Sequence, residues 1–213
     1  MEPSEAVAPY AAYFTRPAEA VLGDLQVYAA LLTKWQQVQN LVSRETLQDL
    51  WRRHIADSLQ VLRLVAGSDR VFLDLGSGGG LPAIPLAVAL KGRGRFTLVE
   101  PTSRKASFLR TVGRELQLEL DVRAVPAQEI DSRETAPDVI TSRALAPLPE
   151  LLTLAAPFFA PDTKGIFHKG REHGEEIAQA RSNWSFDVVI IPSDTNPDAA
   201  LLQISNCRAR SKG

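Results

Sequence analysis

The most informative stretch of this chain is Val-Phe-Leu-Asp-Leu-Gly-Ser-Gly-Gly-Gly-Leu-Pro, at residues 71–82. An apolar run ends beside an acid, a glycine cluster follows, and a proline that can begin a helix closes the stretch. This order is typical of a buried parallel strand that passes into a helix and leaves room for a ligand. Because glycine lacks a Cβ atom, the cluster lets the chain bend sharply and approach that ligand closely. The stretch therefore predicts a nucleotide-type cofactor site.

Two common nucleotide motifs do not fit the residues after the cluster. A phosphate-binding P-loop needs a lysine and a hydroxyl residue after its last glycine, whereas this chain continues Leu81-Pro82-Ala83-Ile84. The dinucleotide fingerprint needs a third glycine three positions after its second, and here that position is Leu81. The spacing therefore excludes a P-loop and disfavours a dinucleotide site.

Two acids at the ends of neighbouring predicted strands indicate a different cofactor. Asp74 lies two residues before Gly76, where its charge would repel a pyrophosphate but suits a cationic group, such as the amino or sulfonium group of S-adenosylmethionine. Glu100 ends the next apolar run, where a carboxylate can accept hydrogen bonds from both hydroxyls of a ribose. The combination favours an S-adenosylmethionine-dependent methyltransferase over a dehydrogenase.

The composition argues against several other classes of protein. The chain has 213 residues, a net charge of −1, one cysteine (Cys207) and three histidines. A lone cysteine permits no internal disulfide, and histidines without cysteine partners make a metal site unexpected. We expect no membrane span, because no apolar run reaches the ~20 residues that cross a bilayer. The first residues are acidic and lack the basic start of a signal peptide, so we expect a soluble cytoplasmic protein.

Alternating patterns along the chain predict an α/β fold. Residues 1–17 contain three prolines and are expected to form a loose arm; an amphipathic helix over 18–40 and further helices to residue 65, the first capped by Ser43, should follow. After that, strands and helices alternate, which predicts a parallel sheet with helices on both faces. The expected strands are 71–75, 95–100, 121–125, 137–142, 164–169, 185–191 and 200–207. The expected helices between them are 83–91, 103–118, 147–156 and 172–182.

The end of the chain narrows the fold class further. Only residues 192–199 separate the last two expected strands, which is too short for a helical crossover, so these strands should form an antiparallel hairpin. A mostly parallel seven-stranded sheet that ends in such a hairpin is the Rossmann-like fold of class I S-adenosylmethionine-dependent methyltransferases. We therefore expect an N-terminal arm and helical extension, residues 1–66, packed on a methyltransferase domain, residues 67–213.

In such a fold, ligands bind outside the carboxyl ends of the strands, where the strand order switches. Residues 74–80 and Glu100 fall there. Residues 126–129, Pro-Ala-Gln-Glu, should either reach the adenine ring or form a plain turn. Arg143 follows the fourth strand, where it could bind a cofactor group or a substrate phosphate, or form a surface salt bridge.

Basic residues could form a positive rim around this site, although each taken singly is more typical of a solvated face. They are Arg52, Arg53, Arg104, Lys105, Arg110, Arg114, Arg208, Arg210 and Lys212. Because the net charge is only −1, contact with RNA must come from such a local patch and would depend on salt.

Missing residue types narrow the reaction. Cys207 is not placed to be the nucleophile of a pyrimidine C5 methyltransferase, and the chain has no Pro-Pro pair of the kind that adenine amino-group methyltransferases present. Guanine N7 carries a lone pair and no proton, so its methylation needs no general base. The enzyme then has only to align nucleophile, methyl group and sulfur. We therefore assign no catalytic acid or base.

Taken together, the motifs resemble the bacterial small-subunit ribosomal-RNA guanine-N7 methyltransferase family, also called the glucose-inhibited division protein B family. The resemblance runs from near Asn40 to near Gly170. Its most specific features are the segment His54-Ile55-Ala56-Asp57-Ser58 and the Gly-Leu-Pro end of the loop. It also includes Asn40-Leu41-Val42-Ser43, Val99-Glu100, Arg104-Lys105, Phe108-Leu109, Ser142-Arg143-Ala144 and Lys169-Gly170.

The resemblance implies that the product is 7-methylguanosine in the 530 loop of 16S ribosomal RNA, in the small ribosomal subunit. It implies that Gly76 and Leu81 line the methionine end of S-adenosylmethionine. The adenine would meet Ala127 and Gln128, and Arg143 would lie beside the cofactor. The glycine cluster and the acid after the second strand, discussed above, add Gly78 and Glu100 to the expected cofactor-binding residues. We also expect the protein to be a monomer.

Two positions depart from the pattern of the family, and three others have two alternative roles. Ala83 stands where the family often has glycine, which tightens helix packing slightly. Gln128 stands where the family often has glutamate, so the adenine contact would rest on an amide or on backbone groups. The residues His54, Asp57 and Ser58 either shape the floor of the active site or form a structural helix junction.

Two other classes of function remain open. A small-molecule methyltransferase on the same fold would lack basic surface around the mouth of the cofactor site. A nicotinamide-binding or non-catalytic nucleotide-binding module would bind NAD and not S-adenosylhomocysteine.

Overall fold

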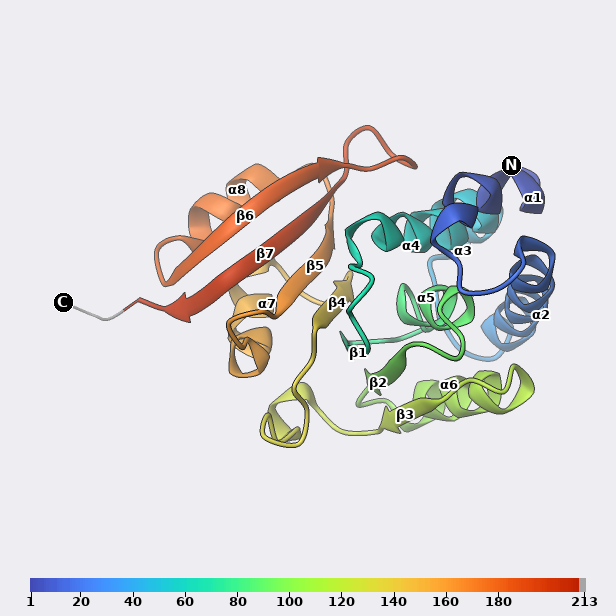
Figure 1. The fold of residues 1–213 in the computed structure, drawn as a ribbon, viewed down its shortest axis with the longest axis horizontal. Coiled ribbons are helices and arrows are strands. Elements are labelled where there is room, and N and C mark those ends of the chain that lie inside the picture. The colour runs from blue at the N-terminus through green and yellow to red at the C-terminus, as the bar shows by residue number, and fades with distance from the viewer. Residues whose placement is uncertain (211–213) are drawn as a thin grey trace.

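The computed structural model describes residues 1–210, and one seven-stranded sheet forms the centre of the fold (Figure 1). Its strands are β1 (Val71–Leu75), β2 (Arg95–Val99), β3 (Leu120–Arg123), β4 (Val139–Arg143), β5 (Lys164–Lys169), β6 (Trp184–Pro192) and β7 (Ala200–Ala209). The order is β3-β2-β1-β4-β5-β7-β6, with β1 to β5 parallel and β7 antiparallel to both neighbours. The predicted parallel sheet with a C-terminal antiparallel hairpin is therefore confirmed.

Helices cover both faces of the sheet, and Figure 1 shows the blue N-terminal helices on the opposite side of it from the orange helices near the C-terminus. On one face pack α1 (Pro3–Val7), α2 (Ala18–Gln36), α3 (Arg44–Leu47), α4 (Asp57–Leu59), α5 (Ala83–Ala89) and α6 (Ser103–Glu115). On the other face pack α7 (Leu148–Ala155) and α8 (His173–Ala180). Within residues 1–210, none of these helices combines the length and apolarity that crossing a bilayer requires.

Alternating apolar side chains on the strands build a separate buried core on each face. In β1, Phe72 belongs to the core under α2 and α5, whereas Leu73 belongs to the core under α7 and α8. The same alternation places Ile166 in the first core and its neighbour Phe167 in the second. Both faces of the sheet are therefore covered. The edge at which the parallel strands have their carboxyl ends remains available for a ligand site.

The N-terminal arm is not loose, contrary to the expectation from its prolines. Residues 3–13 form α1 and a 3-10 turn, η1 (Ala8–Tyr13), and Ala6, Val7 and Tyr10 are buried in the first core. The hydroxyl of Tyr10 donates to Asp194 at 2.9 Å, in the β6–β7 connection. These contacts with distant parts of the chain hold the arm in place.

The helical extension also differs in detail from the prediction. Helix α2 ends at Gln36 rather than near residue 40, because the Gln36 side chain accepts hydrogen bonds from the N–H groups of Leu41 and Val42 and stabilises a turn. Ser43 occupies the N-cap position of α3, but its side chain makes no capping hydrogen bond. The chain then continues through one turn of π-helix, η2 (Trp51–Ala56), into α4 and a 3-10 turn, η3 (Gln60–Leu64). π-Helical turns are rare and often lie at functional sites.

Candidate active site

The glycine cluster forms a tight loop between β1 and α5, at the carboxyl edge of the sheet. The N–H groups of Gly76 and Ser77 both donate to the carbonyl oxygen of Val99, at the end of β2, over 3.0 Å. Gly76, Gly78 and Gly80 have φ angles of +71°, +52° and +84°, which favour glycine. A Cβ atom on Gly78 would meet nothing closer than the Gly76 carbonyl oxygen, at 3.8 Å. The loop therefore leaves open space against its backbone.

Glu100 connects this loop to the turn before α6. Its side chain is buried, and Oε2 accepts a hydrogen bond of 2.9 Å from the N–H of Gly78. Oε1 accepts another, also 2.9 Å, from the N–H of Thr102. Each carboxylate oxygen has a second lone pair, so Glu100 can hold the loop and still accept hydrogen bonds from a ligand.

A cavity of about 1080 Å³ opens beside the loop. It is lined by most of the residues predicted to bind a cofactor, namely Gly76, Gly78, Leu81, Glu100 and Arg143. Further walls come from residues 40–43, from the end of β5 at His168 to Gly170, and from the β6–β7 connection. Ala127 and Gln128 lie in a 3-10 turn after β3 and are not among the described residues that line the cavity.

Asp74 does not line the cavity either, although the sequence suggested a direct role toward a cationic ligand. Its carboxyl is buried beneath the loop, where Oδ1 accepts a 2.6 Å hydrogen bond from the hydroxyl of Thr141. Oδ2 has no hydrogen-bond partner among residues 1–210. Burial raises the pKa of Asp74 to about 7, against the opposing effect of the neighbouring Ser77 and Thr141 hydroxyls. The carboxyl is thus poised between its neutral and ionised forms near neutral pH.

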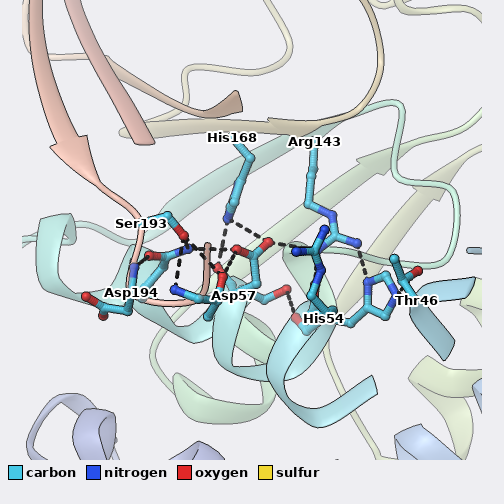
Figure 2. Close-up of polar contacts among 11 residues, drawn as sticks. Thr46, His54, Asp57, Arg143, His168, Ser193 and Asp194 are labelled. Carbon is cyan, nitrogen blue, oxygen red and sulfur yellow. Dashed lines mark hydrogen bonds and ion pairs between the residues drawn. The ribbon is translucent and has the colours of Figure 1, made fainter. Parts of the chain in front are cut away.

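The guanidinium of Arg143 is held at the cavity wall by the helix junction at residues 53–57 (Figure 2). Nη1 donates to Oδ2 of Asp57 at 2.8 Å and to the carbonyl oxygen of Arg53 at 3.0 Å. Nη2 contacts Nδ1 of His54. Arg143 therefore forms an ion pair, but not the surface salt bridge that the sequence offered as an alternative. The pair lies in the cavity wall, where the side chain of Asp57 is only 15% exposed.

Asp57 is the centre of this network, which Figure 2 shows reaching three other elements. Its Oδ1 accepts hydrogen bonds from the Thr195 hydroxyl at 2.7 Å and from the Gln60 amide at 2.9 Å. The backbone carbonyl of Asp57 accepts one from Nε2 of His168 at 2.8 Å. Burial opposes ionisation, but His168, Arg143 and the Thr195 hydroxyl hold the pKa of Asp57 below its usual value. Asp57 is thus a carboxylate that joins α4, β4, β5 and the β6–β7 connection.

His54 and Ser58 complete the junction. Burial, reinforced by the neighbouring charge of Arg143, lowers the pKa of His54 to about 3, so the imidazole is neutral at physiological pH. Its Nε2 lies 2.9 Å from the hydroxyl oxygen of Thr46. The Ser58 hydroxyl donates to the backbone carbonyl of His54 at 2.6 Å. His54 and Asp57 line the cavity, whereas Ser58 is buried behind it.

Comparison with known proteins identifies the family. A sequence model of the family described as GidB, rRNA small subunit methyltransferase G, matches residues 22–197. The chain belongs to this family. Ribosomal RNA small subunit methyltransferase G of Cereibacter sphaeroides is 42% identical over 199 residues, which cover 87% of this chain and 96% of that relative. The family resemblance found in the sequence is confirmed.

Solved structures agree with the fold of this family member. The crystal structure of ribosomal protein L11 methylase from Lactobacillus delbrueckii subsp. bulgaricus has a TM-score of 0.56 at 16% identity, covering 72% of this chain and 78% of that one. A variant of MtNAS, solved in complex with S-adenosylmethionine, has a TM-score of 0.56 at 14% identity, covering 89% of this chain and 77% of that one. These likenesses confirm the class I methyltransferase fold.

Three of the polar side chains that line the cavity, those of His54, Asp57 and Lys169, are held by partners within the protein. Arg143 occupies Nδ1 of His54, and both carboxylate oxygens of Asp57 already accept hydrogen bonds. The Nζ of Lys169 donates to the carbonyl of Ala146 at 2.6 Å and pairs with Glu176 at 2.8 Å. Each of these side chains is thus committed to a partner within this part of the structure, and no catalytic acid or base is assigned.

Some residues that shape the site escaped the sequence analysis. The Tyr28 hydroxyl, on α2, donates a 2.6 Å hydrogen bond to the carbonyl of Gly79, 51 residues away in the chain. Thr195 holds Asp57 from 138 residues away. No local pattern marks either residue, because each role depends on a partner that only the fold brings near.

The predicted basic residues do not all converge. Arg53 and Lys105 line the cavity, and Arg52 and Arg104, their neighbours in sequence, are exposed. Arg208 lies near the far end of β7, roughly 25 Å along the strand from Ala200 at the cavity. The terminal residue of the predicted basic tail, Lys212, lies outside the described residues. Of the basic residues predicted for the rim, Arg53 and Lys105 are therefore the two that line the cavity within residues 1–210.

Proposed function

We propose that this family member transfers a methyl group from S-adenosylmethionine to N7 of a guanosine in the 530 loop of 16S ribosomal RNA. The observation that carries the proposal is the cavity between the glycine loop and Arg143, in a chain of the small-subunit RNA methyltransferase family. The proposed partner is the 16S RNA in the small ribosomal subunit, and we propose that the protein acts as a cytoplasmic monomer.

The residues present fit the proposed cofactor. The space that a Cβ atom on Gly78 would fill is open, so a ligand can lie against the loop backbone. Glu100 lines the same cavity and is proposed to accept hydrogen bonds from the ribose hydroxyls. Gly76 and Leu81 are proposed for the methionine end, and Arg143 for a position beside it. S-adenosylmethionine, when bound, supplies an electrophilic methyl group.

The residues proposed for the adenine lie in the 3-10 turn that follows β3. Ala127 and Gln128 follow β3, whose last residue Arg123 accepts a hydrogen bond from the N–H of Glu100 at 3.0 Å. The 3-10 turn therefore follows β3, the neighbour of the strand β2 that ends at the proposed ribose site. We propose that its backbone, or the exposed Gln128 amide, contacts the adenine edge.

The proposed acceptor agrees with the chemistry of the cavity wall. Guanine N7 already carries a lone pair, so no side chain has to remove a proton before it attacks. His54 and Asp57 are both occupied by hydrogen bonds, which suits a reaction that needs positioning rather than proton transfer. Methylation at N7 puts positive charge on the base, and the neutral state of His54 adds no second cation beside Arg143.

The decisive experiment is mass spectrometry of small-subunit RNA from cells with and without this gene. We expect 7-methylguanosine in the 530 loop to disappear with the gene and to return with the wild-type gene but not with one encoding Gly78→Val. An unchanged 530 loop in the deleted strain would overturn the proposed target. Loss of a methyl group from another position of the RNA would keep the activity and correct the site.

A second measurement separates RNA from small-molecule substrates. Arg53→Ala and Lys105→Ala should each lower the slope of log affinity for small-subunit RNA against log salt by about one. The matched control is Arg208→Ala, which lies away from the cavity and should leave the slope unchanged. Equal slopes for all the proteins would favour a small-molecule methyltransferase on this fold.

A further inference from the structure

We propose that His54 and Asp57 are positioning residues whose hydrogen bonds fix the guanidinium of Arg143 at the cofactor cavity. The inference rests on the proposed function, because it takes S-adenosylmethionine as the ligand beside Arg143. It goes beyond that function by choosing between the two roles that the sequence left open for this segment. The contacts among Arg143, His54 and Asp57 carry it (Figure 2).

The hydrogen-bond directions around His54 follow from the partners on the two ring nitrogens. The Thr46 hydroxyl has a single proton, which it donates to the carbonyl of Ser43 at 3.0 Å. Its oxygen can therefore only accept from His54, so Nε2 carries the ring proton. Nδ1 then presents a lone pair to Arg143, which has donors only. The whole chain of contacts is consistent with a neutral imidazole that acts as an acceptor for the guanidinium.

The π-helical turn supplies the second anchor. The N–H of Asp57 bonds to the carbonyl of Arg52, five residues earlier, which is the π-helical spacing. In an α-helix this N–H would instead bond to the carbonyl of Arg53. That carbonyl accepts from Nη1 of Arg143 at 3.0 Å. The irregular backbone of η2 thereby turns a main-chain acceptor toward Arg143.

Asp57 supplies the third anchor and is itself held. Oδ2 accepts from Arg143 at 2.8 Å, while Thr195 and Gln60 occupy Oδ1. With Asp57 fixed by these groups, the guanidinium is held by a side-chain carboxylate, an imidazole nitrogen and a backbone carbonyl. An arginine held this way loses little further freedom when it binds a ligand, which favours tight binding.

The test compares calorimetric affinity for S-adenosylhomocysteine among variants of the full chain. His54→Leu removes the acceptor and should weaken binding by at least ~10-fold. His54→Asn can place a side-chain oxygen near the position of Nδ1 and should restore affinity to within about threefold of wild type. Asp57→Asn, which removes the charge that faces Arg143, should weaken binding by at least ~10-fold. Equal affinities for wild type, His54→Leu and Asp57→Asn would overturn the inference.

A double-mutant cycle separates positioning from a merely structural role. If His54 acts through Arg143, then His54→Leu should cause no further loss of affinity in an Arg143→Ala background. Equal losses in both backgrounds would overturn the inference. Thr163→Val is the matched control, because it removes a buried hydrogen bond to the carbonyl of Pro137 just before β5, at the amino ends of the strands, and should lower stability without changing affinity.

A spectroscopic readout keeps the inference testable without a ligand. Proton–nitrogen correlation spectra of the labelled protein at neutral pH should show His54 neutral and protonated at Nε2. A ring protonated at Nδ1 would overturn the inference, because Nδ1 could not then accept from Arg143. Wild-type protein that fails to bind S-adenosylhomocysteine would contradict the proposed function, and the spectra would then decide the positioning role by themselves.

Discussion

The hydroxyl of Tyr28, on α2, donates a 2.6 Å hydrogen bond to the carbonyl oxygen of Gly79 in the glycine loop. Tyr28 is fully buried, and a Cβ atom on Gly79 would lie 3.2 Å from the carbonyl oxygen of Leu41, in the turn that follows α2. The N-terminal extension thus touches the loop proposed to hold the cofactor at two points. It is part of the framework of the site.

Replacing Tyr28 by phenylalanine tests this connection. The variant keeps the ring but leaves the Gly79 carbonyl without its donor, which should lower the free energy of unfolding by about 1–3 kcal/mol. Affinity for S-adenosylhomocysteine should fall with it, because the loop loses one of its anchors. Urea denaturation and calorimetry measure the two effects. Unchanged affinity at reduced stability would show that the extension supports the fold but not the site.

Gly78→Val should abolish cofactor binding without unfolding the chain. The added side chain would enter the open space beside the loop. The backbone at position 78 also has a left-handed φ of +52°, which strains a branched residue. Calorimetry should show affinity for S-adenosylhomocysteine reduced at least ~10-fold, with a cooperative unfolding transition retained. The control is Gly23→Ala in α2, which has free space and should raise stability by about 0.5–1 kcal/mol with unchanged affinity. Tight binding by the Gly78→Val protein would remove the loop from the cofactor site.

Glu100→Ala should weaken cofactor binding and leave RNA binding largely unchanged. The substitution removes the proposed acceptor for the ribose and also frees the N–H groups of Gly78 and Thr102, so some stability should be lost as well. Calorimetry with S-adenosylhomocysteine and filter binding with small-subunit RNA measure the two affinities separately. If cofactor affinity stays at the wild-type level, Glu100 only holds the loop.

The raised pKa of Asp74 predicts a specific dependence of stability on pH. A carboxyl whose pKa rises to about 7 on folding binds its proton more tightly in the folded than in the unfolded state. Its contribution to stability is therefore complete below the unfolded pKa and is lost as the pH rises through about 7. Asp74→Asn cannot ionise, so its stability relative to wild type should increase with pH, by up to ~1.4 kcal/mol per unit.

Urea denaturation at about pH 5 and about pH 8 measures this difference. Gln37→Ala, at an exposed position without a titratable side chain, serves as the control and should run parallel to wild type over the same range. Parallel curves for Asp74→Asn and wild type would show that the buried carboxyl does not titrate as described.

The parts of the fold that follow from local pattern were predictable. The apolar run before the glycines predicted β1 at residues 71–75, the bounds that the structure has. The short connection at 192–199 predicted the hairpin, because chain length alone rules out a crossover. The acid after β2 likewise placed Glu100 beside the loop, since neighbouring parallel strands end at the same edge.

Features that depend on distant partners were not predictable in the same way. Three prolines suggested a loose arm. The arm instead packs against the first core, and Tyr10 bonds to Asp194, which is 184 residues away in the chain. The contact between His54 and Arg143 joins residues that are 89 positions apart in the chain. The π-helical turn at residues 51–56 could not be predicted either, because the spacing of apolar residues does not distinguish it from an α-helix. Ala127 and Gln128 stay a prediction from the family resemblance, since they lie outside the lining of the cavity.

The most direct measurement is a crystal structure of the full chain with S-adenosylhomocysteine. We predict the ligand in the cavity, its ribose hydroxyls bonded to Glu100 and its amino-acid end against Gly76, with the guanidinium of Arg143 alongside. A ligand bound elsewhere on the protein, with this cavity left vacant, would contradict the account.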